Sequence, residues 1–176
     1  PIMTDVEILK RDAGIAACSY VSSGMKVGLG TGSTVKHTVI ELGRMIAEEG
    51  LDIVGVPTSL ATEKLALEVG IPLVKLSDID GLDVVIDGAD EYDPQFQLIK
   101  GGGAALLREK IVAQESSGMV VVADDRKRVE KLGAFPLPIE ITPFAHQATI
   151  RVLGRVLDCR VNCRMAGDNP VITDNG

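Results

Sequence analysis

The sequence predicts an α/β fold: a Rossmann-like, open parallel sheet with helices on both faces, followed by a smaller α+β domain. Two observations support this prediction. Up to about residue 130, short and nearly continuous apolar runs alternate with longer amphipathic stretches, which is typical of repeated strand–helix–strand units. After the segment Phe-Pro-Leu-Pro at residues 135–138, the elements become shorter. We therefore assign residues 1–132 to a Rossmann-like domain and residues 133–176 to a partial small domain.

The first half of the large domain begins with a helix at residues 8–21, where apolar residues recur about one turn apart. Residues 25–29 follow as a short apolar strand that runs into glycines. A helix is predicted at residues 33–49, because Gly50 is suited to a C-cap, and residues 51–56 form the next strand. The glycine-rich segment thus lies between a strand and a helix.

The second half continues the alternation. Thr58 or Ser59 is a suitable N-cap for the next helix, which Gly70 closes. The most apolar strand runs directly into the segment Asp-Gly-Ala-Asp-Glu at residues 87–91. The expected elements are helices at 59–69 and 103–115 and strands at 71–76, 82–86 and 119–123.

The small domain is predicted to combine one helix with short strands. The expected elements are strands at 139–141, 160–164 and 170–173 and a helix at 144–157. The chain ends in Asn-Gly, a hairpin-turn signal that a further strand is expected to follow. We therefore expect this domain to be incomplete at its C-terminal end.

Composition limits the classes of function. The 176 residues carry a net charge of −7 and only 3% are aromatic, which argues against binding the nucleic-acid backbone or stacking on bases. The three cysteines do not suggest a disulfide framework or a zinc site. The sequence has no apolar run of membrane-spanning length and no signal-peptide pattern at its start. We expect a cytoplasmic protein.

The segment Gly-Leu-Gly-Thr-Gly-Ser-Thr at residues 28–34 is the first that carries chemistry. Glycines bring backbone N–H groups close to a ligand, and the helix N-terminus and hydroxyl groups favour an anion, most naturally phosphate. A P-loop would need Gly-Lys after it, and a dinucleotide fingerprint would need glycine at Ser33. The alternative is a tight turn that binds no ligand.

Two further segments carry candidate catalytic groups. Asp87 and Asp90 follow a strand, where ligands bind in open parallel sheets, and suit acid–base chemistry or Mg²⁺ binding. The alternative is a turn whose carboxylates cap local N–H groups. Lys100 precedes three glycines, and Glu109 falls on the following helix, where apolar neighbours would raise its pKa. Periodicity alone favours an exposed Glu109, and Lys100 could equally be a solvated loop lysine.

The basic run at residues 126–128 follows another strand and could close over an anionic ligand, although alone it is more typical of a solvated surface. His37 and His146 have no Ser or Cys partner with nucleophile-elbow spacing, so we assign neither a catalytic role.

Four linked motifs give the sequence a close resemblance to the ribose-5-phosphate isomerase A family. They are Gly-Thr-Gly-Ser-Thr at 30–34, Asp-Gly-Ala-Asp-Glu at 87–91, Lys-Gly-Gly-Gly-Ala-Ala with Arg-Glu-Lys at 100–110, and Phe-Pro-Leu-Pro with Glu140. They occur in the family's order and spacing, from near residue 8 to the end of the chain. Family members continue for several dozen residues more.

The resemblance implies interconversion of ribose 5-phosphate and ribulose 5-phosphate in the pentose phosphate pathway, without a cofactor or a metal. Glu109 is implied to move a proton between C1 and C2, and Lys100 to stabilise the enediolate. Asp87 is implied to assist ring opening, with Asp90 close by. The implied sugar-phosphate contacts are Thr31, Gly32, Ser33, Thr34, Asp87, Gly88, Ala89, Asp90, Lys100, Gly101, Gly102, Gly103 and Lys127, with Lys10 as a further phosphate ligand.

Two other functions were weighed. A sugar-phosphate sensor, as in some bacterial transcription regulators, would need the glycine loop but not the set of Asp87, Lys100 and Glu109. A nucleotide-dependent enzyme is disfavoured by the missing Gly-Lys and by Ser33. The family is usually dimeric or tetrameric, and its small domain often mediates contacts. We therefore expect a homodimer or homotetramer that binds a small sugar phosphate.

Overall fold

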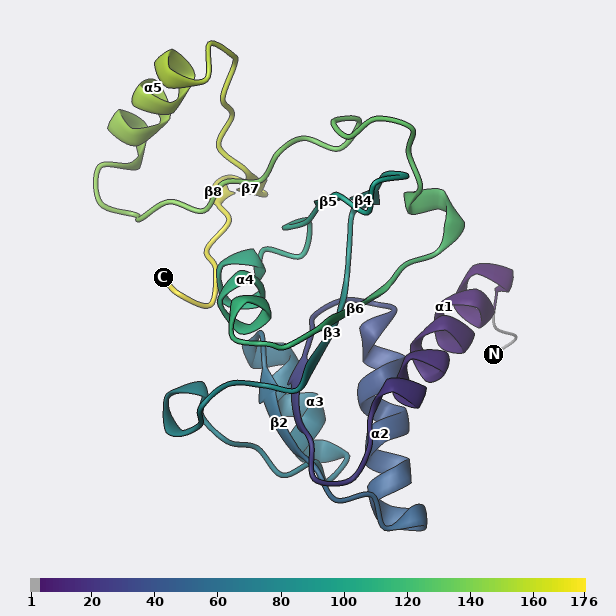
Figure 1. Cartoon of the computed structure of the whole chain (residues 1–176). Coiled ribbons are helices and arrows are strands. Elements are labelled where there is room, and N and C mark those ends of the chain that lie inside the picture. The colour runs from purple at the N-terminus through teal and green to yellow at the C-terminus, as the bar shows by residue number, and fades with distance from the viewer. Residues whose placement is uncertain (1–3) are drawn as a thin grey trace. The chain divides into compact units, whose positions relative to one another are not determined.

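The computed structural model describes residues 4–176, which form two compact units, one ending at Pro138 and the other spanning Ile139–Gly176. The first unit is an α/β domain with a parallel sheet, as the sequence predicts (Figure 1). The division falls six residues after the boundary expected from the change in sequence pattern. Each unit is described separately below.

Four parallel strands form the sheet of the first unit in the order β2-β1-β3-β6. They are β1 (Lys26–Leu29), β2 (Val54–Pro57), β3 (Val84–Gly88) and β6 (Met119–Val122). Within this sheet Leu29 pairs with Ile86, so β1 and β3 end side by side. Because the carboxyl ends of parallel strands meet at one edge, the glycine-rich loop and the segment that begins with Asp87 are neighbours.

Helices cover both faces of this sheet. The larger apolar core joins side chains of α2 (Val35–Glu49), α3 (Leu60–Glu68) and the 3₁₀-helix Ala17–Tyr20, which directly follows α1 (Asp5–Ala16), to one face of the strands. On the other face, Val112 of α4 (Leu106–Gln114) packs with Val85 and Val56. Helices pack on both faces of the sheet because the strands present apolar side chains on each side. The prediction of a sheet covered on both sides is therefore confirmed.

Several predicted elements differ from the structure. The first helix starts earlier, at Asp5, and continues from Ala17 to Tyr20 as a 3₁₀-helix. The expected strand at 71–76 makes only a single bridge, between Leu73 and Gly55. Pro72 explains this, since it has no N–H to donate to a ladder and is confined to sheet edges.

A short antiparallel hairpin was not predicted. It consists of β4 (Glu91–Tyr92) and β5 (Leu98–Ile99), directly after the acidic segment. Two-residue strands are too short to show a period in the sequence. The hairpin matters because Ile99 precedes Lys100, so it carries that lysine back toward the end of β3.

The second unit contains the helix α5 (His146–Val156), which confirms the predicted helix with slightly shorter bounds. The expected strands at 139–141 and 160–164 are wrong, and the third is replaced by the pair β7 (Met165–Ala166) and β8 (Asn169–Pro170). Glu140 instead accepts side-chain hydrogen bonds from Thr173 and Asn175. Side-chain contacts thus replace the expected backbone ladder.

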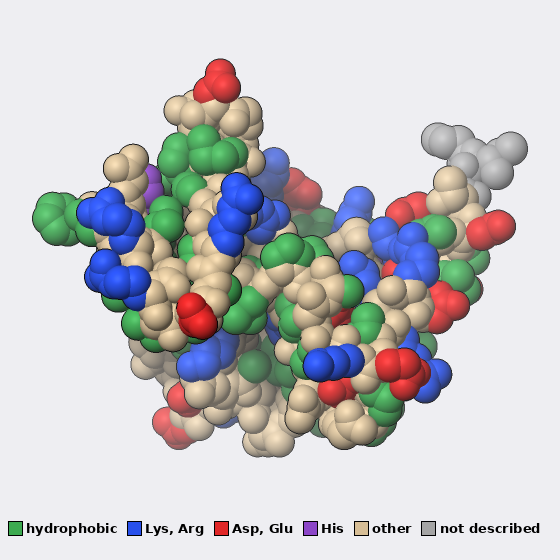
Figure 2. Space-filling view, turned by 90° about the horizontal axis from the view of Figure 1, so that it is seen from above, with side chains coloured by type: hydrophobic (Ala, Val, Ile, Leu, Met, Phe, Trp, Pro, Cys, Tyr) green, Lys and Arg blue, Asp and Glu red, His purple; other side chains and the backbone are tan. Residues whose placement is uncertain are grey.

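Charged side chains of both signs are interspersed on the face shown in Figure 2. Within residues 4–176, every helix is too short or too polar to cross a lipid bilayer.

The buried carboxylate of Glu91 holds the segment that leads out of the first unit. It is 4% exposed and accepts hydrogen bonds from the N–H groups of Gly133, at 2.8 Å, and of Phe135. Replacing Glu91 with Gln leaves one acceptor oxygen for two donors. We expect Glu91→Gln to lower the free energy of unfolding in urea by about 1–3 kcal/mol. Glu130→Gln, at an exposed carboxyl, is the control. Equal stability of the two variants would contradict a stabilising role for the hydrogen bonds that Glu91 accepts.

Candidate active site

The loop after β1 approaches the carboxylate of Asp87 very closely. The N–H groups of Thr31 and Gly88 donate to Asp87 Oδ1 at 3.1 and 2.7 Å, and the N–H of Gly30 donates to the carbonyl of Ile86 at 2.9 Å. A Cβ at Gly30 would lie 2.3 Å from Oδ1, so no side chain fits there. Glycine is thus required at position 30 because the loop backbone packs directly against the carboxylate and leaves no space for a side chain.

Lys100 connects two buried carboxylates. Its Nζ lies 2.7 Å from Glu109 Oε1 and 3.2 Å from Asp87 Oδ2, and it donates a third contact to the carbonyl of Gly88. Asp87 is 1% exposed and Glu109 is 5% exposed. Within residues 4–176, Asp87 Oδ2 receives no hydrogen bond, although the ammonium group is near. One cation therefore serves two carboxylates, and one oxygen retains acceptor capacity.

The pKa of Glu109 is raised to about 7. Burial of the carboxyl group is the largest cause, and the charge of the neighbouring Asp87 carboxylate is the next. Lys100 acts in the opposite direction, by its charge and by its hydrogen bond. A carboxyl group with a pKa near 7 exchanges protons readily at neutral pH. The expectation that its surroundings raise the pKa of Glu109 thus has a structural cause: burial contributes most, and the charge of the Asp87 carboxylate, which the sequence did not indicate, adds to it.

This pKa predicts how stability depends on pH. Because the folded-state pKa lies above the ordinary glutamate value of 4.5, the contribution of Glu109 to stability is fully present below about 4.5 and is lost as pH rises through about 7. At about 1.4 kcal/mol for each unit by which the pKa is raised, the change amounts to at most about 3–4 kcal/mol. We expect Glu109→Gln to gain stability relative to the parent between pH 5 and pH 8 in urea unfolding. Glu115→Gln, at an exposed carboxyl of the same segment, is the control, and a pH-independent difference between parent and Glu109→Gln would contradict the assignment.

Asp90 is fixed by the three-glycine segment. Its Oδ2 accepts a hydrogen bond from the N–H of Gly102 at 2.7 Å, and a Cβ at Gly102 would lie 2.4 Å from Oδ1. The loop from β5 to α4 is therefore closed against this carboxylate. The residues 100–103 and 87–90, which are separate motifs in the sequence, form one wall in the structure.

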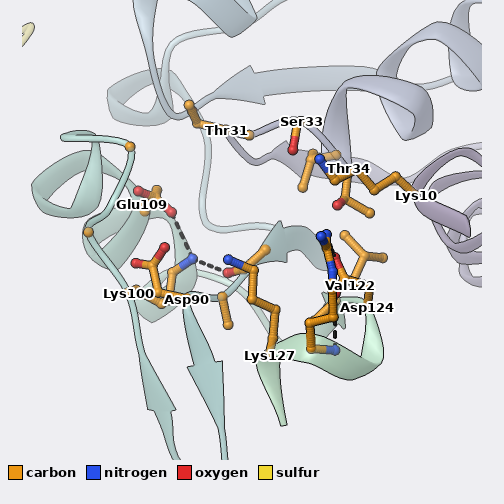
Figure 3. A pocket seen from close by; sticks show the side chains of 18 residues that line it. Lys10, Thr31, Ser33, Thr34, Asp90, Lys100, Glu109, Val122, Asp124 and Lys127 are labelled. Carbon is orange, nitrogen blue, oxygen red and sulfur yellow. Dashed lines mark hydrogen bonds and ion pairs between the residues drawn. The ribbon is translucent and has the colours of Figure 1, made fainter. Parts of the chain in front are cut away.

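These segments surround a cavity of about 280 Å³. Figure 3 shows Glu109 and Lys100 on one side of it and Lys10 on the other. The sequence-predicted residues that line it are Lys10, Thr31, Gly32, Ser33, Thr34, Gly88, Ala89, Asp90, Lys100, Gly101, Gly103, Glu109 and Lys127. Asp87 lies beneath the surface, and Gly102 contributes through its bond to Asp90.

The end of β6 also lines the cavity, and of this segment the sequence indicated only the basic run at residues 126–128. Val122, Ala123 and Asp124 contact the cavity together with Arg126. The Arg126 guanidinium binds Asp124 through Nε at 2.8 Å and Nη2 at 2.9 Å, and it holds the pKa of that carboxyl below its usual range. The signal that could have found these residues is their place directly after a parallel strand.

The side of the cavity near α2 is suited to an anion. Ser33 and Thr34 lie at the start of α2, and the N-cap residue Thr34 makes no side-chain hydrogen bond to the helix. Lys10 reaches this side of the cavity from α1, with its Nζ 3.2 Å from Glu7 Oε1. A helix N-terminus, hydroxyl groups and ammonium groups all stabilise negative charge. Among residues 4–176, no group of three or more His, Cys, Asp or Glu side chains is arranged to hold a metal ion.

The family model described as ribose 5-phosphate isomerase A (phosphoriboisomerase A) matches residues 54–176. The ribose-5-phosphate isomerase A of Bacillus mycoides is 52% identical over 168 residues, which cover 96% of this chain and 75% of that protein. The chain belongs to the ribose-5-phosphate isomerase A family.

Solved structures of the ribose-5-phosphate isomerase A family have the same fold. The enzyme from Methanocaldococcus jannaschii superimposes with a TM-score of 0.91 at 41% identity, covering 97% of this chain and 76% of that one. A D-ribose-5-phosphate isomerase in complex with phospho-erythronic acid also has a TM-score of 0.91 at 41% identity, covering 98% of this chain and 77% of that one.

Proposed function

We propose that the protein interconverts D-ribose 5-phosphate and D-ribulose 5-phosphate through an enediolate intermediate. The observation that carries this proposal is Lys100, which joins Glu109 and Asp87 at the wall of a phosphate-suited cavity. Membership of the ribose-5-phosphate isomerase A family supports it. The complex of a relative with phospho-erythronic acid, a phosphorylated sugar acid, supports a sugar phosphate as the ligand.

The reaction moves one proton between neighbouring carbons. Glu109 in its ionised form takes the proton from C2 of the open-chain aldose. The C2–H electron pair forms the C1–C2 double bond of the enediolate, while the π pair of the C1 carbonyl moves onto O1. Protonated Glu109 then returns the proton to C1, which gives the ketose. A pKa of about 7 suits both halves, because the group must first accept and then donate at similar pH. No electron leaves the substrate, so we propose that no cofactor takes part.

Lys100 and Asp87 act on the oxygens. The Lys100 ammonium would stabilise the negative charge that develops on the enediolate oxygens. Asp87 Oδ2, with its remaining acceptor capacity, would accept the O1 proton and pass it to the ring oxygen as the ring opens. During isomerisation it would move a proton from O2 to O1. Asp90, held by Gly102, would bind a neighbouring hydroxyl. The carboxylates thus have separate tasks, one on carbon and one on oxygen.

The phosphate would bind at the opposite side of the cavity. Ser33, Thr34 and the start of α2 would donate hydrogen bonds, and Lys10 and Lys127 would neutralise the charge. The remaining glycine-rich backbone at residues 31–32, 88–89 and 101–103 would contact the sugar between these ends. Anchoring the phosphate positions C1 and C2 for proton transfer.

We also propose that the protein works in the cytoplasm as a homodimer or homotetramer, with the small domain at residues 133–176 as lid or contact surface. The family expectation supports this proposal. Sedimentation of the purified chain at several concentrations measures the oligomeric state.

The proposed function is tested by incubating the protein with ribose 5-phosphate in D₂O with excess EDTA. We expect ribulose 5-phosphate to form and to carry deuterium at C1, the carbon to which Glu109 returns a proton after exchange with solvent, and the reverse reaction to place deuterium at C2 of ribose 5-phosphate. Saturable binding of ribose 5-phosphate without any product would instead indicate a sensor and would overturn the proposal.

A further inference from the structure

Behind the glycine-rich loop, four hydroxyl groups form one buried cluster. Thr31 Oγ1 lies 2.7 Å from Thr58 Oγ1, 2.8 Å from Ser59 Oγ and 3.2 Å from Thr62 Oγ1. Thr58, Ser59 and Thr62 are 0%, 4% and 7% exposed. Buried hydroxyl groups are retained only where their hydrogen bonds are satisfied, so this cluster is a specific arrangement.

The hydrogen bonds of the cluster run in one direction and end on the loop backbone. Thr31 Oγ1 donates to Ser59 Oγ, Ser59 Oγ donates to Thr62 Oγ1 at 3.0 Å, and Thr62 Oγ1 donates to the carbonyl of Gly30 at 2.9 Å. In addition, Thr58 Oγ1 donates to the carbonyl of Leu29 at 3.1 Å. The cluster therefore holds three consecutive residues of the loop.

One peptide unit links this cluster to the catalytic centre. The carbonyl of Gly30 and the N–H of Thr31 belong to the same planar peptide bond and point in opposite directions. The carbonyl accepts from Thr62, while the N–H donates to Asp87 Oδ1 at 3.1 Å. Fixing the carbonyl therefore fixes the N–H. Rotation of this peptide would instead turn the carbonyl oxygen toward the Asp87 carboxylate, which is electrostatically unfavourable.

We propose that Thr58, Ser59 and Thr62 are positioning residues that hold the Gly30–Thr31 peptide against Asp87 and thereby orient its carboxylate for catalysis. The kinetic part of this inference rests on the proposed isomerase function. The hydroxyl of Thr31, expected from the sequence to contact the substrate, serves this cluster through its bond to Ser59. Ser33 and Thr34, at the start of α2, remain the hydroxyl donors for the phosphate.

The test compares variants at two buried threonines. Thr62→Val removes the hydroxyl with little change of shape, and Thr62→Ser keeps it. Thr38→Val is the matched control, because Thr38 is also fully buried and its hydroxyl donates to the carbonyl of Gly14 at 2.7 Å, away from the loop. We expect kcat to fall about tenfold or more in Thr62→Val, with KM changed less than about twofold, because the phosphate contacts are untouched.

Rescue decides between positioning and general destabilisation. Thr62→Ser is expected to restore kcat to within about threefold of the parent, and Thr38→Val to keep the parent kcat. An unchanged kcat in Thr62→Val, or an equal fall in Thr38→Val, would overturn the inference. If Thr62→Val does not fold, Thr58→Val, which removes the donor to Leu29, takes its place in the same comparison.

A second readout needs no turnover. Hydrogen exchange of the Thr31 amide, followed by NMR, reports the bond to Asp87 directly. We expect faster exchange in Thr62→Val than in the parent, in Thr62→Ser or in Thr38→Val. A parent without isomerase activity would refute the proposed function, while the exchange data would still decide this inference. Equal exchange in all four proteins would overturn it.

Discussion

Replacing Glu109 with Gln is expected to lower kcat by about 10²- to 10⁴-fold, the contribution of a positioned general base. The carboxamide has the shape of the carboxyl group but cannot accept the proton from carbon. KM should change little, because the residues proposed to bind the phosphate lie across the cavity from Glu109. The fold should persist, since a neutral group at this buried position resembles the protonated state that burial already favours. Steady-state kinetics at pH 7.5, with circular dichroism as a check on folding, measure the effect.

The control for Glu109→Gln is Glu115→Gln, which removes an exposed carboxyl at the end of α4. This variant should keep the parent kcat. The parent should also show an acid limb in its pH profile with an apparent pKa near 7, because only ionised Glu109 accepts the proton. A folded Glu109→Gln variant that retains more than about a tenth of the parent kcat would refute the role of base.

The second large effect is expected for Lys100→Met. This substitution removes the ammonium group that we place beside the enediolate oxygens, and such donors are worth about 10²- to 10³-fold in kcat. It also leaves Asp87 and Glu109 without their common cation. Because Lys100 lowers the pKa of Glu109, its loss should raise that pKa further and move the acid limb of kcat to higher pH.

Lys110→Met, at an exposed lysine of α4, is the matched control and should behave as the parent does. The two consequences of Lys100→Met are separable by a pH series, since the shifted limb disappears at high pH whereas the loss of oxyanion stabilisation remains. Full recovery of kcat at high pH would show that Lys100 only tunes Glu109. An unshifted limb would show that the contact between Lys100 and Glu109 has no influence on the base.

The sequence was sufficient for the parts of the fold that depend on local pattern. Gly50 ends α2 in the left-handed conformation that a C-cap requires, and Ser59 caps α3 through the N–H of Thr62. The four paired strands coincide with the most apolar runs. The hairpin β4–β5 was not predicted, and the strand expected around Pro72 makes only a single bridge. Strand pairing depends on partner strands that sequence periodicity does not reveal.

The active site also combines features that the sequence shows with features that depend on tertiary contacts. Glycines and carboxylates after strands are visible in the sequence, because the ends of parallel strands gather at one edge. The burial of Glu109 is not visible in the sequence, since α4 carries charged residues beside it, and the ammonium group of Lys100 that offsets the cost of burying the carboxylate lies on another segment. The hydroxyl cluster was also hidden. Thr31 meets residues 58–62 only because Leu29 pairs with Pro57 in the sheet.

The close approach of Gly30 and Gly102 to two carboxylates has a consequence for redesign of this enzyme. Neither glycine accepts even a methyl group without moving a carboxylate, so the part of the cavity around Asp87 and Asp90 has a composition that engineering cannot vary. The end of β6 carries no such restriction, and its Arg126 is more than half exposed. Libraries that seek longer or differently branched sugar phosphates should therefore diversify residues 123–126 and leave both glycine loops, and Lys127 as a proposed phosphate ligand, unchanged.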